Sequence, residues 1–302
     1  MAKETVPARI YWGLAKVFDR KRHKQHKREL LLEALADFGT REDAFSFGRP
    51  EGRPTFKHSG NAGDLIYALP MIKELAGSQG ASLRLALNVP ISNKHLRHPL
   101  GNVMLNQGSF DLLAGLLAAQ DYLQEVRVHE GEAVDFDLDV IRRAPLPHDR
   151  LGISHWYGYF LGLAPDLSRP WLSVEPDVST RDTVLLARSG RYRNTHLDFR
   201  FLDSVPDLAF VGLPEEYEDM RRQLPNLRWL PVADFHELAR LIAGCRLFIG
   251  NQSVPFSLAE GLKVPRVLEL YPLSPNVIPM GGQAHGILFQ RQFEHVVASL
   301  LA

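Results

Sequence analysis

The sequence predicts an α/β protein made of two domains, each built on a parallel sheet, that face each other across a cleft. Its 302 residues suit about two domains. In the second half, short apolar strands alternate with amphipathic helices, which is typical of parallel sheets joined by right-handed crossovers. Each half also contains a segment, 59–64 or 248–253, in which a strand ends at a glycine turn and a helix follows. Ligands of such sheets bind beyond the carboxyl ends of the strands, where both segments fall.

In the first half, the expected elements begin at Pro54 with a strand, a turn and a helix. That helix contains Pro70, so it must start late or kink there. Further regular elements are expected at 83–89 (strand), 109–123 (helix) and 126–129 (strand). Residues 131–180 contain many prolines and are expected to be irregular. Three alternating aspartates in this stretch are expected to form the solvated face of an edge strand: Asp135, Asp137 and Asp139.

In the second half, strands are expected at the short apolar runs 183–187, 208–213, 227–232, 247–249 and 266–270. Two of the helices between them carry start signals. Pro214, followed by Glu215 and Glu216, opens one helix in agreement with the helix dipole. Asp234 caps the next helix, and Glu237 completes a capping box.

These elements divide the chain into four expected parts. The boundary between the domains is placed within 169–179, where Pro170 and Pro176 interrupt regular structure. The parts are a basic helical extension (1–50), a first α/β domain (51–172), a second α/β domain (173–285) and a C-terminal helix (286–302).

Composition excludes several classes of function. Lys and Arg together number 35, as do Asp and Glu, so no overall positive field favours nucleic acid. The single cysteine excludes a disulfide framework and a thiolate zinc site, which fits a reducing compartment. No apolar run is long enough to span a bilayer, and no apolar segment precedes the first charges as in a secretory signal. We therefore expect a cytoplasmic protein.

The basic run 20–28 allows two interpretations. It is either a solvated helix face or a surface for an anionic partner. In the second case residues 16–28 contact the inner face of an anionic membrane, or a polyanionic acceptor.

Asp64 is the candidate catalytic residue of the first segment. It lies at the expected start of a helix, where aspartate is a common N-cap. The functional alternative is a general base that takes a proton from an acceptor hydroxyl, kept ionised by the helix end.

The second segment is a candidate phosphate site. Gly250 leaves room for a pyrophosphate against the backbone, and Asn251, Gln252 and Ser253 lead into a helix whose free N–H groups suit an anion. Two carboxylates follow, Glu260 in that helix and Glu269 at the end of the next strand. They are expected either to contact ribose hydroxyls or to form salt bridges.

Three arginines follow the first strand of the second half: Arg188, Arg191 and Arg193. Guanidinium groups bind phosphate oxygens with two donors at once and can stabilise a departing diphosphate without a metal. The alternative is a solvated loop. His95 and His98 have no acidic or cysteine partner at ligand spacing, so no metal site is expected. Serine-hydrolase and phosphate-loop motifs are absent from the sequence.

The two segments together resemble the ADP-heptose:lipopolysaccharide heptosyltransferase superfamily. The resemblance rests on Gly63-Asp64 with 68–75, and on 248–253 with 258–265, and it covers roughly residues 55–280 in order. It implies two facing Rossmann-like domains, the glycosyltransferase B-type fold. The first would bind the acceptor and the second the nucleotide sugar. It also implies an inverting, metal-independent sugar transfer with Asp64 as the base and Ser253 at the donor site.

The match to the superfamily is incomplete in the second segment. Residues 251–256 lack the acidic residue, the glycine and the histidine that heptosyltransferases usually show there. The resemblance therefore implies a nucleotide-diphosphate sugar as donor substrate, with no further cofactor, rather than ADP-heptose in particular. The acceptor would be a glycan, a lipid-linked or a protein hydroxyl, as in the synthesis of cell-envelope polysaccharide. Two alternatives remain open: a non-catalytic nucleotide-sugar or glycan-binding relative, and a polysaccharide pyruvyltransferase-like enzyme.

Overall fold

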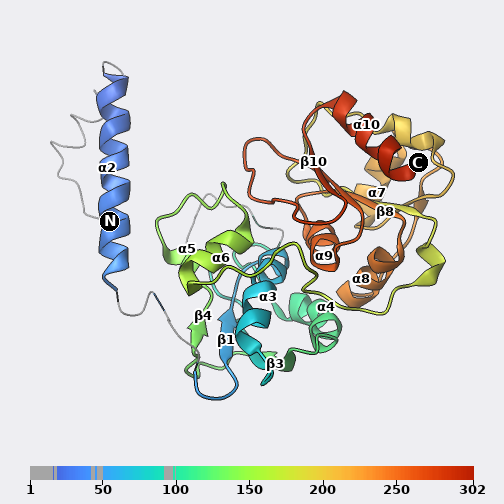
Figure 1. Ribbon diagram of the computed structural model, residues 1–302. Coiled ribbons are helices and arrows are strands. Elements are labelled where there is room, and N and C mark those ends of the chain that lie inside the picture. The colour runs from blue at the N-terminus through green and yellow to red at the C-terminus, as the bar shows by residue number, and fades with distance from the viewer. Residues whose placement is uncertain (1–15, 17–18, 42–44, 46–49, 92–97, 99) are drawn as a thin grey trace.

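The computed structural model describes residues 16, 19–41, 45, 50–91, 98 and 100–302, and it contains two parallel sheets (Figure 1). The first has four strands in the order β3-β2-β1-β4, and the second has six in the order β10-β9-β8-β5-β6-β7. All pairs between neighbouring strands are parallel. The predicted fold class, two α/β units with parallel sheets, is confirmed.

The first sheet comprises β1 (Thr55–His58), β2 (Ala81–Leu85), β3 (Leu123–Val128) and β4 (Phe136–Asp137). Its helices are α3 (Ala62–Ala76), α4 (Gln107–Ala118), α5 (Val140–Arg143) and α6 (Ile153–Leu161). The central strand β2 is buried along its whole length, because helices cover both faces of a parallel sheet.

The second sheet comprises β5 (Val184–Ala187), β6 (Leu208–Phe210), β7 (Arg228–Trp229), β8 (Leu247–Asn251), β9 (Arg266–Glu269) and β10 (Ala284–Ile287). Its helices are α7 (Pro214–Arg221), α8 (Phe235–Gly244), α9 (Val254–Leu262) and α10 (Gln290–Leu301), with short 3₁₀ turns at Val178–Thr180 and Arg200–Ser204. The predicted start of α8 is confirmed, since the Asp234 carboxylate accepts a hydrogen bond from the Glu237 N–H at 2.8 Å. The domain boundaries stay predictions; the one after residue 285 falls inside β10.

For the first half, one of two alternatives is excluded and another expectation is wrong. The helix with Pro70 does not start late, because α3 begins at Ala62 and continues to Ala76. The loss of one helical hydrogen bond at proline is offset by the burial of nearly every residue from Leu65 onward. Residues 131–180 are not irregular throughout, since they contain β4, α5 and α6. The apolar face of α6 packs on α3, a contact between distant segments that the local sequence does not indicate.

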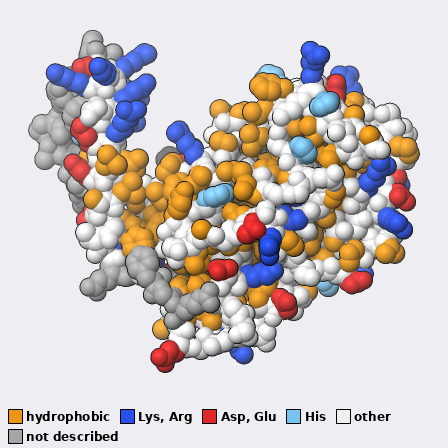
Figure 2. Space-filling model, in the orientation of Figure 1, with side chains coloured by type: hydrophobic (Ala, Val, Ile, Leu, Met, Phe, Trp, Pro, Cys, Tyr) orange, Lys and Arg blue, Asp and Glu red, His pale blue; other side chains and the backbone are white. Residues whose placement is uncertain are grey.

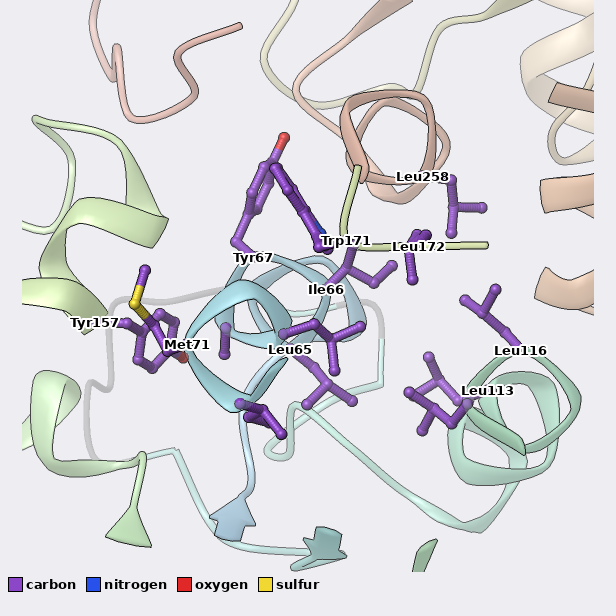
Figure 3. Close-up of a cluster of buried hydrophobic side chains, with 14 of the residues drawn as sticks. Leu65, Ile66, Tyr67, Met71, Leu113, Leu116, Tyr157, Trp171, Leu172 and Leu258 are labelled. Atoms are coloured by element: carbon purple, nitrogen blue, oxygen red, sulfur yellow. The ribbon is translucent and has the colours of Figure 1, made fainter. Parts of the chain in front are cut away.

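The helices that follow the two segments are neighbours in space. α3 packs against α9, and α4 packs against α8, so one hydrophobic core joins the two sheets. Figure 3 shows this core along α3, with Ile66 pointing toward Leu172 and Leu258. A methyl group placed on Gly63 would lie 3.9 Å from both the Ser257 Oγ and a Val254 methyl carbon. The first turns of α3 and α9 therefore adjoin.

The helix α2 (Arg20–Gly39) extends from the body of the molecule (Figure 1). Its end is attached through Phe38, whose ring contacts Phe45 and Phe160 edge-on. Lys and Arg side chains gather on the far half of this helix (Figure 2), which contains the basic run 20–28. Among the residues that the structure describes, no helix is both long and apolar enough to cross a bilayer.

Candidate active site

A cavity of about 590 Å³ opens at the carboxyl edge of the first sheet. Most of its lining comes from the first sheet and its loops, including Asp64. Two residues of the second half, Tyr192 and Asn276, complete it. The cavity is thus built by both halves of the chain, as the predicted cleft requires.

Asp64 lies in the first turn of α3 and does not cap it. The N-cap position belongs to Asn61, whose side chain makes no capping bond. Within the described residues, the hydrogen bond that Asp64 receives comes from Asn61 Nδ2, 3.1 Å from Asp64 Oδ2. Burial raises the pKa of Asp64 above the ordinary aspartate value, and Arg142, the Asn61 bond and Arg191 oppose that rise. A carboxylate made more basic in this way is suited to accept a proton.

A buried network supports the turn that precedes Asp64. Arg142 pairs with Asp139 and donates to Ser59 Oγ at 3.0 Å. The Asp139 carboxylate also accepts the Ser59 N–H at 2.8 Å. A Cβ on Gly60 would overlap the Arg142 guanidinium, so a larger residue in this turn would displace the arginine. The network fixes the backbone that leads into α3.

The expectation that the alternating aspartates are solvated is wrong for two of them. Asp137 pairs with Lys57 at 2.9 Å and with Arg143 at 3.3 Å, and Asp139 with Arg142. These side chains line the cavity. The reason is that β4 pairs with β1 at the edge of the sheet, which places Asp137 opposite Lys57. The following residues lead into α5, whose arginines pair with Asp137 and Asp139.

In the second segment, Gly250 and Asn251 shape the backbone. Gly250 is buried within β8, and a Cβ there would lie 2.8 Å from the Phe248 ring and 3.1 Å from the Ala187 carbonyl. Glycine at this position accommodates the packing of β8 on β5. Asn251 is fully buried; its Nδ2 donates to the carbonyls of Ser189 and Arg191 at 3.0 and 2.6 Å, and its Oδ1 accepts the Ser189 N–H. Asn251 therefore fixes the backbone of the loop 188–193, which carries the three arginines.

Gln252 and Ser253 connect the start of α9 to its surroundings. Gln252 Nε2 donates to the Asn276 Oδ1 at 2.8 Å, and Gln252 Oε1 accepts the Tyr271 N–H at 2.7 Å. Asn276 in turn donates to the His148 carbonyl of the first half at 3.2 Å. Ser253 is the N-cap residue of α9, and its hydroxyl donates to the Asn251 carbonyl rather than accepting a helical N–H.

The expected ribose-binding carboxylates are both engaged in ion pairs. Glu269 is buried and binds Arg188 at two points, with the Asn194 N–H as a further donor at 2.6 Å. Glu260 is also buried, and it accepts from Lys263 and Arg266. Of the two alternatives considered from the sequence, these contacts match the salt bridges, because Glu269 at the end of β9 and Glu260 within α9 each face a buried arginine.

The three loop arginines differ in their surroundings. Arg188 is buried against Glu269, with the Phe199 ring 4.4 Å from its guanidinium carbon. Arg193 pairs with Asp219 and donates to the Ser189 carbonyl at 2.8 Å. Arg191 is exposed, and among the described residues its guanidinium has no hydrogen bond or ion pair. Its charge lowers the pKa of Asp64, and the residue that follows it, Tyr192, lines the cavity.

From the sequence, no role at this site was predicted for Asn61, His98, Arg142 or Asp139. The hydrogen bonds between His98 and Asn61, and from Ser59 to Arg142 and Asp139, join segments far apart in the chain, for which no local spacing gives a signal. His95 lies outside the described residues. Within the described part of the chain, no three His, Cys, Asp or Glu side chains gather as a metal site would require. Metal independence stays a prediction.

No protein-family model matches the sequence, and no curated protein is significantly similar to it. Solved structures are similar in fold. The structure of a family 9 glycosyl transferase from Veillonella parvula matches with a TM-score of 0.54 at 12% identity, over 84% of this chain and 99% of that one. The E. coli heptosyltransferase WaaC, solved with ADP, matches with a TM-score of 0.57 at 13% identity, over 82% of this chain and 99% of that one. The chain therefore has the glycosyltransferase B-type fold that the sequence resemblance implied.

Proposed function

We propose that this protein is an inverting, metal-independent glycosyltransferase. It transfers a sugar from a nucleotide-diphosphate sugar to a hydroxyl of a glycan, a lipid-linked or a protein acceptor. The observation that carries the proposal is the position of Asp64, a carboxylate with a raised pKa in a cavity of about 590 Å³, beside the start of α9. A base and an anion-binding helix start thus adjoin, as a displacement reaction requires.

The reaction follows from this arrangement. Asp64 takes the proton of the acceptor hydroxyl while the hydroxyl oxygen forms a bond to the anomeric carbon. The bond from that carbon to the diphosphate oxygen breaks on the opposite face, so the configuration inverts. The leaving diphosphate carries the negative charge away, and Arg191 and the first turn of α9 stabilise that charge.

The contacts divide the donor-site residues into two groups. Arg191 and Ser253, with the backbone at the start of α9, are available to the diphosphate. The others are engaged by the surrounding protein. Gly250 is closely packed, and hydrogen bonds or ion pairs within the protein occupy the remaining side chains: Arg188, Arg193, Asn251, Gln252, Glu260 and Glu269. The ADP in the WaaC structure supports a nucleoside diphosphate as the ligand of this fold.

The basic half of α2 suits an anionic surface. The run 20–28 contains six Lys or Arg residues on a helix that extends from the body (Figure 2). Each basic side chain near an anionic membrane contributes about 1 kcal/mol. We therefore propose peripheral contact with the inner face of a membrane, where a lipid-linked acceptor would be located.

The test is binding of nucleoside diphosphates to the full chain, by thermal shift and then calorimetry. One of ADP, GDP, UDP or CDP should raise the melting temperature. Arg191→Ala should weaken its binding by about 1.5–3 kcal/mol if the contact is charge-assisted. Arg181→Ala is the matched control, because Arg181 is an exposed arginine just before β5 whereas Arg191 follows that strand. Equal affinity in the two variants, or no stabilising diphosphate, would contradict the proposal.

A further inference from the structure

Asp64 is the end of a chain of three hydrogen-bonded side chains. The His98 Nε2 lies 2.7 Å from the Asn61 Oδ1, and the Asn61 Nδ2 lies 3.1 Å from the Asp64 Oδ2. His98 comes from a tight turn, where its carbonyl accepts the Gly101 N–H at 3.0 Å. Asn61 and His98 are 37 positions apart in the sequence. The contact therefore ties a separate loop to the start of α3.

The direction of each hydrogen bond follows from the partners. The Leu100 N–H donates to the His98 Nδ1 at 3.1 Å, so Nδ1 carries no proton and Nε2 is the donor. Burial and the charge of Arg191 lower the pKa of His98, which keeps the ring neutral. The Asn61 amide then accepts from His98 through its oxygen and donates to Asp64 through its nitrogen. The two hydrogen bonds therefore require the same orientation of the Asn61 amide, with its oxygen toward His98 and its nitrogen toward Asp64.

The Asn61 side chain has no role in capping its helix. The cap position of α3 lacks a side-chain bond, whereas the corresponding residue of α4, Asn106, accepts the Ser109 N–H at 2.9 Å. Asn at an N-cap usually makes such a bond. Asn61 instead uses its amide nitrogen on one oxygen of Asp64. Among the residues that the structure describes, none donates a hydrogen bond to the other oxygen, Oδ1, which leaves it for a ligand in the cavity.

We infer that Asn61 and His98 are positioning residues that orient the Asp64 carboxylate toward the acceptor hydroxyl, an inference that rests on the function proposed above. By fixing Oδ2, the amide sets the direction in which Oδ1 accepts a proton. His98 acts through Asn61, since it holds the amide and prevents its rotation. Preorganisation of this kind matters because a displacement of about 1 Å can lower a rate about 100-fold.

Charged and titratable groups also face Asp64 from other elements. They are Arg142 of α5, His148 before α6 and Arg191 after β5, and each lowers the pKa of Asp64. None is hydrogen-bonded to Asp64 in the structure as described. These three residues are unchanged in the variants below. A change in the pKa of Asp64 can therefore be attributed to loss of the hydrogen bond from the Asn61 amide.

The experiment is a titration of Asp64 in the full chain labelled with ¹³C at the aspartate carboxyl, its signal assigned with Asp64→Asn. Asn61→Ala should raise the pKa of Asp64, because a bond to the charged form is lost. His98→Ala should shift it in the same direction, and His98→Gln, which keeps a donor, should restore it. The double variant should titrate as Asn61→Ala does, since His98 acts through Asn61.

Asn106→Ala is the matched control. It should lower the melting temperature by removing a cap while leaving the Asp64 titration unchanged. An unchanged Asp64 titration in Asn61→Ala, or full additivity in the double variant, would overturn the inference.

A transfer assay separates this inference from the proposed function. Asn61→Ala should lower kcat about 10- to 100-fold with the donor KM unchanged, and should move the acidic limb of the pH profile to higher pH. A normal kcat and pH profile would overturn the positioning role. If Asp64→Asn retains turnover, the proposed base fails instead, while the titration still decides whether Asn61 and His98 orient Asp64.

Discussion

Arg188 and Glu269 form a two-point ion pair at the carboxyl ends of β5 and β9, with Nε–Oε2 and Nη2–Oε1 both at 2.7 Å. Both side chains are almost completely buried. The pair lies at the base of the loop that carries Arg191, so it connects the packing of the second sheet to the proposed diphosphate site. Its two members are 81 positions apart in the sequence.

Removal of one partner of this pair should destabilise the protein strongly. Arg188→Met or Glu269→Gln should each lower the free energy of unfolding by about 3–5 kcal/mol, because an unpaired buried charge or an unpaired buried donor remains. The double variant Arg188→Met/Glu269→Met should recover most of that loss. Urea denaturation measures each value, and equal losses in the double and single variants would contradict this account.

Asp64→Asn should abolish most transfer while keeping the fold. Asparagine cannot accept a proton from the acceptor, so kcat should fall by roughly 10²–10⁴-fold. The assay is the transfer rate with the diphosphate sugar identified by the binding test. Near-normal turnover would show that Asp64 is not the base.

The same variant should change the pH dependence of stability. The pKa of Asp64 in the folded state lies above its value in the unfolded state, so the folded state binds more protons between these two pKa values. The free energy of unfolding therefore falls as the pH rises from the unfolded pKa through the folded one. Asp64→Asn should therefore melt at the same or a higher temperature than wild type at pH 7. The difference should shrink below the ordinary aspartate pKa. A clear loss of melting temperature at pH 7 would instead indicate a structural role.

The basic half of α2 should bind anionic vesicles. Deletion of residues 1–28 removes the basic run and leaves Phe38, which attaches the helix to the body. The truncated chain should keep its melting temperature but lose binding to phosphatidylserine-containing vesicles. Binding of the full chain should weaken with salt, because screening shortens the reach of the charges. Vesicle binding that survives the deletion would exclude the role.

Cys245 should be inert in the folded protein. It is the one cysteine of the chain, it is buried, and burial raises the pKa of its thiol to about 12. The thiolate is the reactive form, so a disulfide reagent at pH 8 should label the native protein only through unfolding. Labelling followed against urea should therefore coincide with the unfolding transition. Rapid labelling without urea would show that the end of α8 opens locally.

Local signals in the sequence determined much of the second half. The strands at 184–187, 247–251 and 266–269 were predicted because both faces of a central parallel strand are buried, which produces short, continuous apolar runs. The start of α8 was predicted because a cap is formed by residues three positions apart. The position of Asp64 in the first turn of a helix after a glycine turn was determined in the same way.

Tertiary structure alone decided which charges pair and which remain open to a ligand. The sequence presented Arg188, Arg191 and Arg193 as equivalent, but only packing placed Glu269 and Asp219 beside two of them. The sequence likewise presented Asn61 only as part of a turn. The hydrogen bond between Asn61 and His98, which lies 37 positions further along the chain, forms only in the folded protein. Helix caps and strand burial act over a few residues and are readable from the chain. Hydrogen bonds and ion pairs between side chains depend on how distant strand ends meet, which is fixed only when the two sheets pack through α3 and α9.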